Sequence, residues 1–133
     1  MVSRIPAEAA VRHTFSVATV LIVDDHPSFR ATARAILEAD GFDIVGEAED
    51  GTSAVEAVHR LEPDVVLLDV QLPDMDGFAV ISEICSGDGH CPKVVLTSSH
   101  DESDFGSIVA RCGAAAFVPK GELGGAAVRA GLR

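Results

Sequence analysis

The segment Val65–Asp69, with the sequence VVLLD, constrains the fold of this chain more than any other. Its apolar residues do not alternate with polar ones, which is typical of a strand that is buried on both faces, as in a parallel sheet. Open sheets of parallel strands bind their ligands at the carboxyl ends of the strands. The segment therefore predicts that the Asp69 side chain lies at a ligand-binding edge.

Other apolar and periodic segments predict the rest of the fold. Four more segments are predicted strands: Thr19–Asp24, Phe42–Glu47, Lys93–Thr97 and Ala115–Val118. Helical periodicity predicts five helices, the first of them ended by Gly41: Ser28–Asp40, Thr52–Leu61, Gly77–Cys85, Glu102–Cys112 and Glu122–Leu132. Alternating strands and helices predict an α/β fold, a doubly wound parallel sheet with helices on both faces.

Length and composition exclude several classes of protein. The 133 residues are enough for a single domain. A net charge of −11 and an isoelectric point near 4.6 argue against direct binding of nucleic acid. No apolar stretch reaches the roughly 18 residues of a membrane span, and the N-terminus lacks an apolar signal segment. Residues 1–18 show no sustained period, so we predict a flexible extension before a domain over residues 19–133.

The cysteines give a prediction about the compartment. Cys85, Cys91 and Cys112 are odd in number and form no C-x-x-C pair. This pattern favours free thiols in a reducing cytoplasm over a disulfide framework.

Three carboxylates, a hydroxyl and an amine follow or end the predicted strands: Asp24, Asp25, Asp69, Thr97 and Lys120. Carboxylates about 4 Å apart repel each other by roughly 4 kcal/mol at an effective dielectric constant near 20. Such a cluster persists if some groups are protonated or if a cation lies among them, and Mg²⁺ suits a site of oxygen ligands that keeps several waters. Each residue alone has an ordinary interpretation, as a helix cap, a turn residue or a solvated lysine. Together they favour phosphoryl transfer to a carboxylate.

Four segments carry a resemblance to a known family: LIVDDHP at 21–27, VLLDVQLPDMDG at 66–77, VVLTSS at 94–99 and FVPKG at 117–121. They resemble the receiver domain of two-component response regulators, over residues 19–132. The resemblance implies a flavodoxin-like sheet with the strand order 2-1-3-4-5. The His-Pro after the acid pair and the Lys-Gly near the end are most similar to the NarL/LuxR-type branch, which normally carries a DNA-binding helix-turn-helix.

The resemblance implies a role for each matched acid. Asp69 would accept a phosphoryl group from a phosphohistidine on a sensor histidine kinase or a phosphotransfer protein. Asp25 and Asp69 would bind Mg²⁺ directly, Asp24 would act through water, and Gln71 would supply its backbone carbonyl. The chain would be a cytoplasmic phosphoacceptor and not an enzyme. At most it would weakly catalyse its own phosphorylation and dephosphorylation.

It also implies a switch. Lys120 and the Thr97 hydroxyl would hold phosphoryl oxygens, and Thr97 would move toward them while the aromatic ring of Phe117 turns inward. The change would alter protein–protein contacts, including those of a possible homodimer. Phe117 stands where the family often has tyrosine, so a packing switch is expected rather than one that uses a hydroxyl.

Other functions compete with this interpretation. Only 13 residues follow Lys120, too few for an output domain within this chain, yet it could be the receiver fragment of a DNA-binding transcriptional regulator. A metal-dependent phosphohydrolase would need an Asp-x-Asp pattern, which the adjacent Asp24 and Asp25 do not provide. A flavin or dinucleotide binder would need a glycine- or hydroxyl-rich loop after the first strand. His26, beside the acid pair, could contact the acids or a partner.

Overall fold

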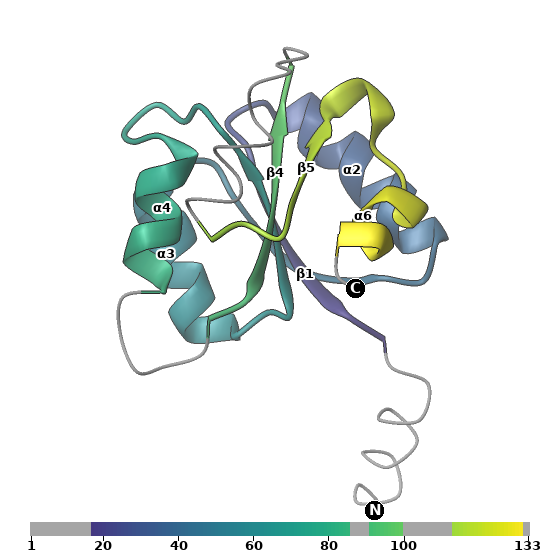
Figure 1. The fold of residues 1–133 in the computed structure, drawn as a ribbon, viewed down its shortest axis with the longest axis horizontal. Helices are drawn as coiled ribbons and strands as arrows, with labels where there is room; N and C mark the ends of the chain where they lie inside the picture. The colour runs from purple at the N-terminus through teal and green to yellow at the C-terminus, as the bar shows by residue number, and fades with distance from the viewer. Residues whose placement is uncertain (1–16, 86–90, 100–112, 132–133) are drawn as a thin grey trace, which may run out of the picture.

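The computed structural model describes residues 17–85, 91–99 and 113–131. Its centre is a five-stranded parallel sheet in the order β2-β1-β3-β4-β5 (Figure 1). The strands are β1 Thr19–Val23, β2 Asp43–Ala48, β3 Val65–Asp69, β4 Lys93–Ser98 and β5 Ala116–Pro119. The predicted α/β class and strand order are confirmed.

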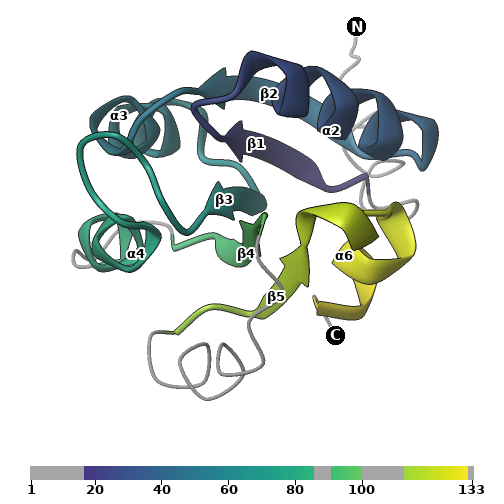
Figure 2. The ribbon, with the colours of Figure 1, turned by 90° about the horizontal axis from the view of Figure 1, so that it is seen from above.

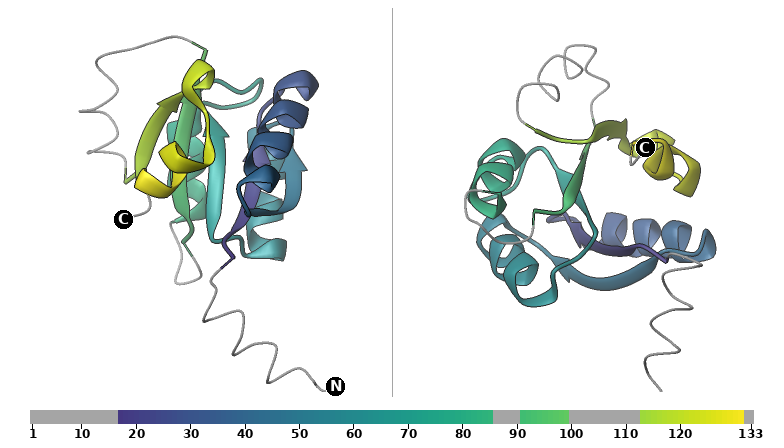
Figure 3. Two further views of the ribbon diagram at one scale, coloured as in Figure 1. Left: turned by 90° about the vertical axis from the view of Figure 1, so that its right-hand side faces the viewer. Right: turned by 60° about the horizontal axis from the view of Figure 1, so that its bottom comes forward.

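Helices cover both faces of the sheet. They are α2 Pro27–Ala39, α3 Gly51–Leu61, α4 Gly77–Ile84 and α6 Gly125–Gly131, with a 3₁₀ turn η1 at Lys120–Glu122. Figure 2 shows α3 and α4 on one side of the sheet and α2 and α6 on the other, and the right-hand view of Figure 3 shows the same division. Among the described residues, no helix is long and apolar enough to cross a membrane. The predicted helix Glu102–Cys112 and residues 1–16 of the predicted extension lie outside the described residues.

The sheet separates two apolar cores. In β1, Leu21 and Val23 belong to the core under α3 and α4, while Val20 and Ile22 belong to the core under α2 and α6. Successive side chains of a strand point to opposite faces, so a strand between two cores must be apolar at every position. All five residues of β3 are buried. This double burial explains why the apolar runs of the sequence do not alternate.

The ends of the helices follow local chemistry. Gly41 has a φ of +94° and lies just beyond α2, as predicted, because a residue without a Cβ atom adopts this left-handed conformation without strain. The last helix begins later than predicted, at Gly125, because residues 120–122 form η1. The backbone N–H of Gly125 donates to Asp40 Oδ2 over 2.9 Å, which joins the start of α6 to the end of α2.

The cysteine prediction is wrong in one respect. Cys85 and Cys91 are joined by a disulfide, with their Cα atoms 5.0 Å apart. Cys85 caps α4 and Cys91 lies just before β4, so the fold brings together two cysteines whose spacing of six residues is not a C-x-x-C pattern. Cys112 lies outside the described residues.

Candidate functional site

The predicted site residues meet at the carboxyl edge of the sheet. Asp24 and Asp25 directly follow β1, and Asp69 is the last residue of β3. Thr97 pairs with Asp69 across β3 and β4. Lys120 directly follows β5. Parallel strands place their carboxyl ends at one edge, so residues far apart in the sequence converge there.

Lys120 binds two of the three acids. Its ammonium nitrogen lies 2.6 Å from Asp24 Oδ2 and 3.3 Å from Asp69 Oδ2. The Asp24 side chain is fully buried and that of Lys120 is 14% exposed, so water screens this ion pair little. The contact with Asp24 is an ion pair without an aligned hydrogen bond, because Asp24 Oδ2 has no hydrogen-bond partner among the described residues. The ammonium is thus held by attraction to both carboxylates.

The environments of Asp24 and Asp69 shift their pKa values in opposite directions. Burial alone would raise the pKa of Asp24, but Lys120 and the bonds from His26 outweigh it and lower that pKa below its ordinary value. Burial raises the pKa of Asp69, and the neighbouring Asp24 charge adds to this, against a backbone bond from Gln71 and the Lys120 charge. Asp24 therefore favours its charged form, whereas the raised pKa of Asp69 favours its protonated form.

His26 contacts the acid pair, one of the two roles open to it from the sequence. Its Nδ1 lies 2.9 Å from Asp24 Oδ1 and 3.1 Å from Asp25 Oδ1, and its backbone N–H donates to Asp24 Oδ1 over 2.8 Å. Arg30 was not predicted to take part, yet its Nη1 donates to the backbone oxygen of Asp24 over 2.6 Å. Its position in the first turn of α2, after the acid pair, was the one sequence signal that could have indicated this contact.

The acids could hold a cation. Ligand atoms of Asp24, Asp25, His26 and Asp69 all lie within 4.8 Å of one another. The Asp25 side chain is 37% exposed, so water can reach the cluster to complete a coordination shell. Three carboxylates, one of them exposed to water, fit the oxygen-rich, partly hydrated coordination of Mg²⁺.

Gln71 and Thr97 flank Asp69. The Gln71 backbone N–H donates to Asp69 Oδ1 over 3.1 Å. This bond does not test the expected role of the Gln71 carbonyl oxygen as a metal ligand, which stays a prediction. The Thr97 hydroxyl is buried and has no hydrogen-bond partner among the described residues. A buried hydroxyl without a partner is costly and uncommon, so this oxygen is suited to meet a group that arrives beside Asp69. Phe117, in β5, is partly buried against the core under α3 and α4.

The loop that follows Asp69 is fixed to the fold. Asp74 accepts bonds from the backbone N–H groups of Gly51 and Thr52, over 2.7 and 3.0 Å, and from the Thr52 hydroxyl over 2.8 Å. At Gly77, a Cβ atom would lie 2.8 Å from the backbone oxygen of Asp69, so only glycine fits this close approach. These contacts hold Asp69 in a defined position.

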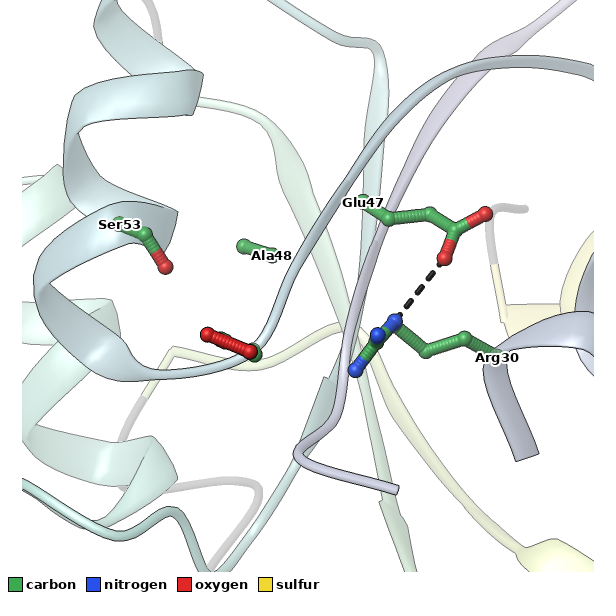
Figure 4. Close-up of a pocket in the computed structure, with 5 residues that line it drawn as sticks. Arg30, Glu47, Ala48 and Ser53 are labelled. Atoms are coloured by element: carbon green, nitrogen blue, oxygen red, sulfur yellow. Dashed lines mark hydrogen bonds and ion pairs between the residues drawn. The ribbon is translucent and has the colours of Figure 1, made fainter. Parts of the chain in front are cut away.

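A pocket of about 290 Å³ is lined by residues of α2, β2 and α3 and of the turn after β2 (Figure 4). The Asp24 N–H donates to the backbone oxygen of Ala48, one of the lining residues, over 3.0 Å. Two of the lining side chains, Arg30 and Glu47, are paired, with Nε 2.9 Å from Oε1. Asp69, at the end of β3, is not among the residues that line this pocket. The lining residues are Arg30, Glu47, Ala48, Glu49 and Ser53.

Comparison with known proteins agrees with this geometry. Residues 20–124 match the model of the response regulator receiver domain family. A transcriptional regulator of Pseudomonas aeruginosa is 40% identical over 103 residues, which are 77% of this chain and 49% of that protein. A protein-glutamate methylesterase/protein-glutamine glutaminase of Myxococcus xanthus is 37% identical over 102 residues, 76% of this chain and 29% of that protein. The chain thus spans about half or less of the length of these curated relatives.

Solved structures place the chain in the same family. The signal receiver domain of the response regulator NarL from Mycobacterium tuberculosis superposes with a TM-score of 0.76 at 34% identity. The match covers 87% of this chain and 97% of that domain, so the likeness extends over a whole receiver domain. With the family match over residues 20–124, these findings show that the chain belongs to the response regulator receiver domains of two-component signalling, with relatives of the NarL/LuxR type.

Proposed function

We propose that Asp69 accepts a phosphoryl group from a sensor histidine kinase or phosphotransfer protein. The observation that carries this proposal is the environment of its carboxylate: a buried hydroxyl without a partner on Thr97 and the ammonium of Lys120 at 3.3 Å. The carboxylate oxygen would form a bond to phosphorus as the bond from phosphorus to the donor breaks. Lys120 and Thr97 would then bind oxygens of the transferred group.

We further propose Mg²⁺ as the resident cation. When bound, it would neutralise charge that develops on the transferred group. Asp25 and Asp69 would be direct ligands, Asp24 would act through water, and Gln71 would contribute its carbonyl oxygen. The mutual approach of the acid side chains within 4.8 Å supports this assignment, because the single ammonium of Lys120 does not balance the charge of three ionised carboxylates.

The response would be a change in protein contacts rather than a reaction on another substrate. Thr97 would move to the phosphoryl group and Phe117 would turn inward, which alters the surface near β5 and the possible homodimer contact. The chain would act as a signalling domain in the cytoplasm, where sensor kinases hold their phosphohistidine.

Incubation with acetyl phosphate and Mg²⁺ tests the proposal. We expect one phosphoryl group per chain, stable in acid and labile in base, detected by mass spectrometry. Asp69→Asn should abolish it, while Asp24→Asn should slow it by weakening the cation site. Asp43→Asn is the matched control, because this acid is exposed at the start of β2, at the opposite end of the strands from the acid cluster. Labelling that persists unchanged in Asp69→Asn would refute the assignment.

A second candidate is the receiver part of a longer DNA-binding regulator. It is favoured by the relative from Pseudomonas aeruginosa, of which the chain covers 49%. The coding frame beyond Arg133 tests it: a helix-turn-helix there would support a DNA-binding output, and an immediate stop codon would exclude it.

A further inference from the structure

The ammonium of Lys120 has a third neighbour besides the two carboxylates. It lies over the ring of Phe29, 4.5 Å from the ring centroid. A lysine ammonium has three N–H donors, and here one side faces Asp24, one faces Asp69 and one faces the aromatic ring. A cation within about 6 Å of a ring centroid is attracted by the negative face of the ring.

Phe29 comes from a helix that packs on the core. It is in the first turn of α2, and it packs against the core cluster that includes Ala33 and Leu37 of the same helix, both fully buried. Lys120 comes from η1, between β5 and α6, and α6 lies beside α2 in Figure 2. The contact between the ring and the ammonium thus joins α2 to η1.

Resting on the proposed function, we propose that Phe29 is a positioning residue that holds the Lys120 ammonium where it meets the oxygens of the transferred phosphoryl group. Lys120 must exchange its contact with the Asp69 oxygen for a phosphoryl oxygen. The ring contact involves neither carboxylate, so it is unchanged by this exchange. Without it, the flexible stem of the lysine would let the ammonium leave toward solvent or stay with Asp24.

An aromatic ring suits this position for an electrostatic reason. The site already holds three carboxylates within 4.8 Å of one another, and a fourth acid would repel the incoming phosphoryl group. A ring attracts the ammonium without adding net charge. A leucine of similar size would fill the space but would lack the negative face.

The competing explanation is that Phe29 only fills space against the core. Fluorinated phenylalanines separate the two, because each fluorine weakens the negative face of the ring while the volume hardly changes. We would place 4-fluoro-, 3,5-difluoro- and 3,4,5-trifluorophenylalanine at position 29, beside Phe29→Leu. Phe42 is the matched control, because its ring contacts Arg129 at 5.1 Å and this pair is not part of the acid cluster.

Two readouts are measured in the 133-residue chain: the rate constant of labelling by acetyl phosphate with Mg²⁺, and the NMR shift of the Lys120 ε-methylene protons. We expect the rate to fall stepwise with each fluorine and about 3- to 30-fold in Phe29→Leu, the factor that corresponds to the usual strength of such a contact. The ring current should shift the ε-methylene protons upfield in the natural chain, and Phe29→Leu should remove this shift. The same fluorines at position 42 should leave the rate unchanged.

Equal rates across the fluorinated series would overturn the proposal, even if Phe29→Leu is slow, because the ring would then act only by packing. A natural chain without the upfield shift would also overturn it. If the natural chain is not labelled at all, the phosphoacceptor function fails and this role of Phe29 fails with it. The NMR shift then shows whether the ring contact itself exists, so the two failures can be told apart.

Discussion

Replacement of Lys120 by methionine tests how the acid cluster is stabilised before any phosphoryl group or cation arrives. Methionine keeps an unbranched stem of similar length and removes the charge. The fully buried Asp24 would lose its ion-pair partner at 2.6 Å, and Asp69 would lose its contact at 3.3 Å. The variant should therefore be less stable than the natural chain.

The distances set the magnitude. At an effective dielectric constant near 20, the two ion pairs correspond to gross attractions of about 6 and 5 kcal/mol. Two effects offset much of this lost attraction. The variant no longer has to bury an ammonium, and Asp69, whose pKa is raised by burial, can take up a proton. Breaking a buried pair by removing one partner usually costs about 3–5 kcal/mol. We expect a loss near the lower limit, about 3 kcal/mol.

Urea unfolding at pH 7 in EDTA measures this loss. Lys93→Met is the control, since Lys93 is exposed at the start of β4 and its replacement should change the free energy of unfolding by less than about 0.5 kcal/mol. The double variant Asp24→Asn with Lys120→Met should recover part of the loss, because the buried charge is then absent. A coupling energy of about 2 kcal/mol between the two positions is expected.

Repeating the unfolding with millimolar MgCl₂ gives an independent check. A cation that binds only the folded state stabilises it by mass action, and the variant lacks the competing ammonium, so Lys120→Met should gain more from MgCl₂ than the natural chain does. A loss below about 1 kcal/mol in EDTA, or additive effects in the double variant, would refute the reasoning that Lys120 compensates the buried charge.

Three more predictions follow from single features. Burial raises the pKa of Asp69, so the ionised carboxylate destabilises the fold at pH values above that pKa. Asp69→Asn should therefore increase the free energy of unfolding at pH 7 in EDTA. If the same increase in stability persists below pH 3.8, the ordinary pKa, burial of the charge is not its cause. Reduction of the Cys85–Cys91 bridge should lower the free energy of unfolding by about 2 kcal/mol. Urea unfolding is measured with and without a reductant, and alkylation confirms that the thiols are free in the reduced sample. Identical unfolding curves would argue against the bridge. Gly125→Ala should cost about 1–3 kcal/mol because its Cβ atom would contact Asp40, whereas Gly121→Ala, with open space around it, should be neutral in the same thermal unfolding assay.

The sequence predicts the sheet well because each strand has its own run of apolar residues, which can be identified without knowledge of the rest of the fold. The bounds of β3 are the same in the prediction and in the structure, since double burial leaves an unbroken apolar run. Helix ends are less well predicted: α6 begins three residues late because Lys120–Glu122 forms its own turn. The Cys85–Cys91 bridge could not be predicted, because it depends on how the end of α4 approaches β4 and not on a spacing motif.

The site shows the same limit at the level of single contacts. The strand ends alone predict that Asp24, Asp69 and Lys120 converge. They do not predict that Lys120 lies closer to Asp24 than to Asp69, because this distance is set by η1 and by the packing of α6 on α2. Helical periodicity predicts the helix that carries Phe29, but it assigns this residue no role at the site. Its contact with the ammonium depends on which way the ring faces, and periodicity carries no information on that.

These contacts distribute the charge unequally among the three acids. Lys120 and His26 both stabilise the charged form of Asp24, so the pKa of Asp24 is lowered although its side chain is fully buried. Asp69 receives less compensation, and its pKa is raised. In the proposed function Asp69 must be ionised to act as the nucleophile, so it would need more positive charge than the Lys120 ammonium supplies. If a cation binds as proposed, Asp25, the exposed acid of the cluster, would be the ligand that first holds it, and the ionisation of Asp69 would then depend on that cation.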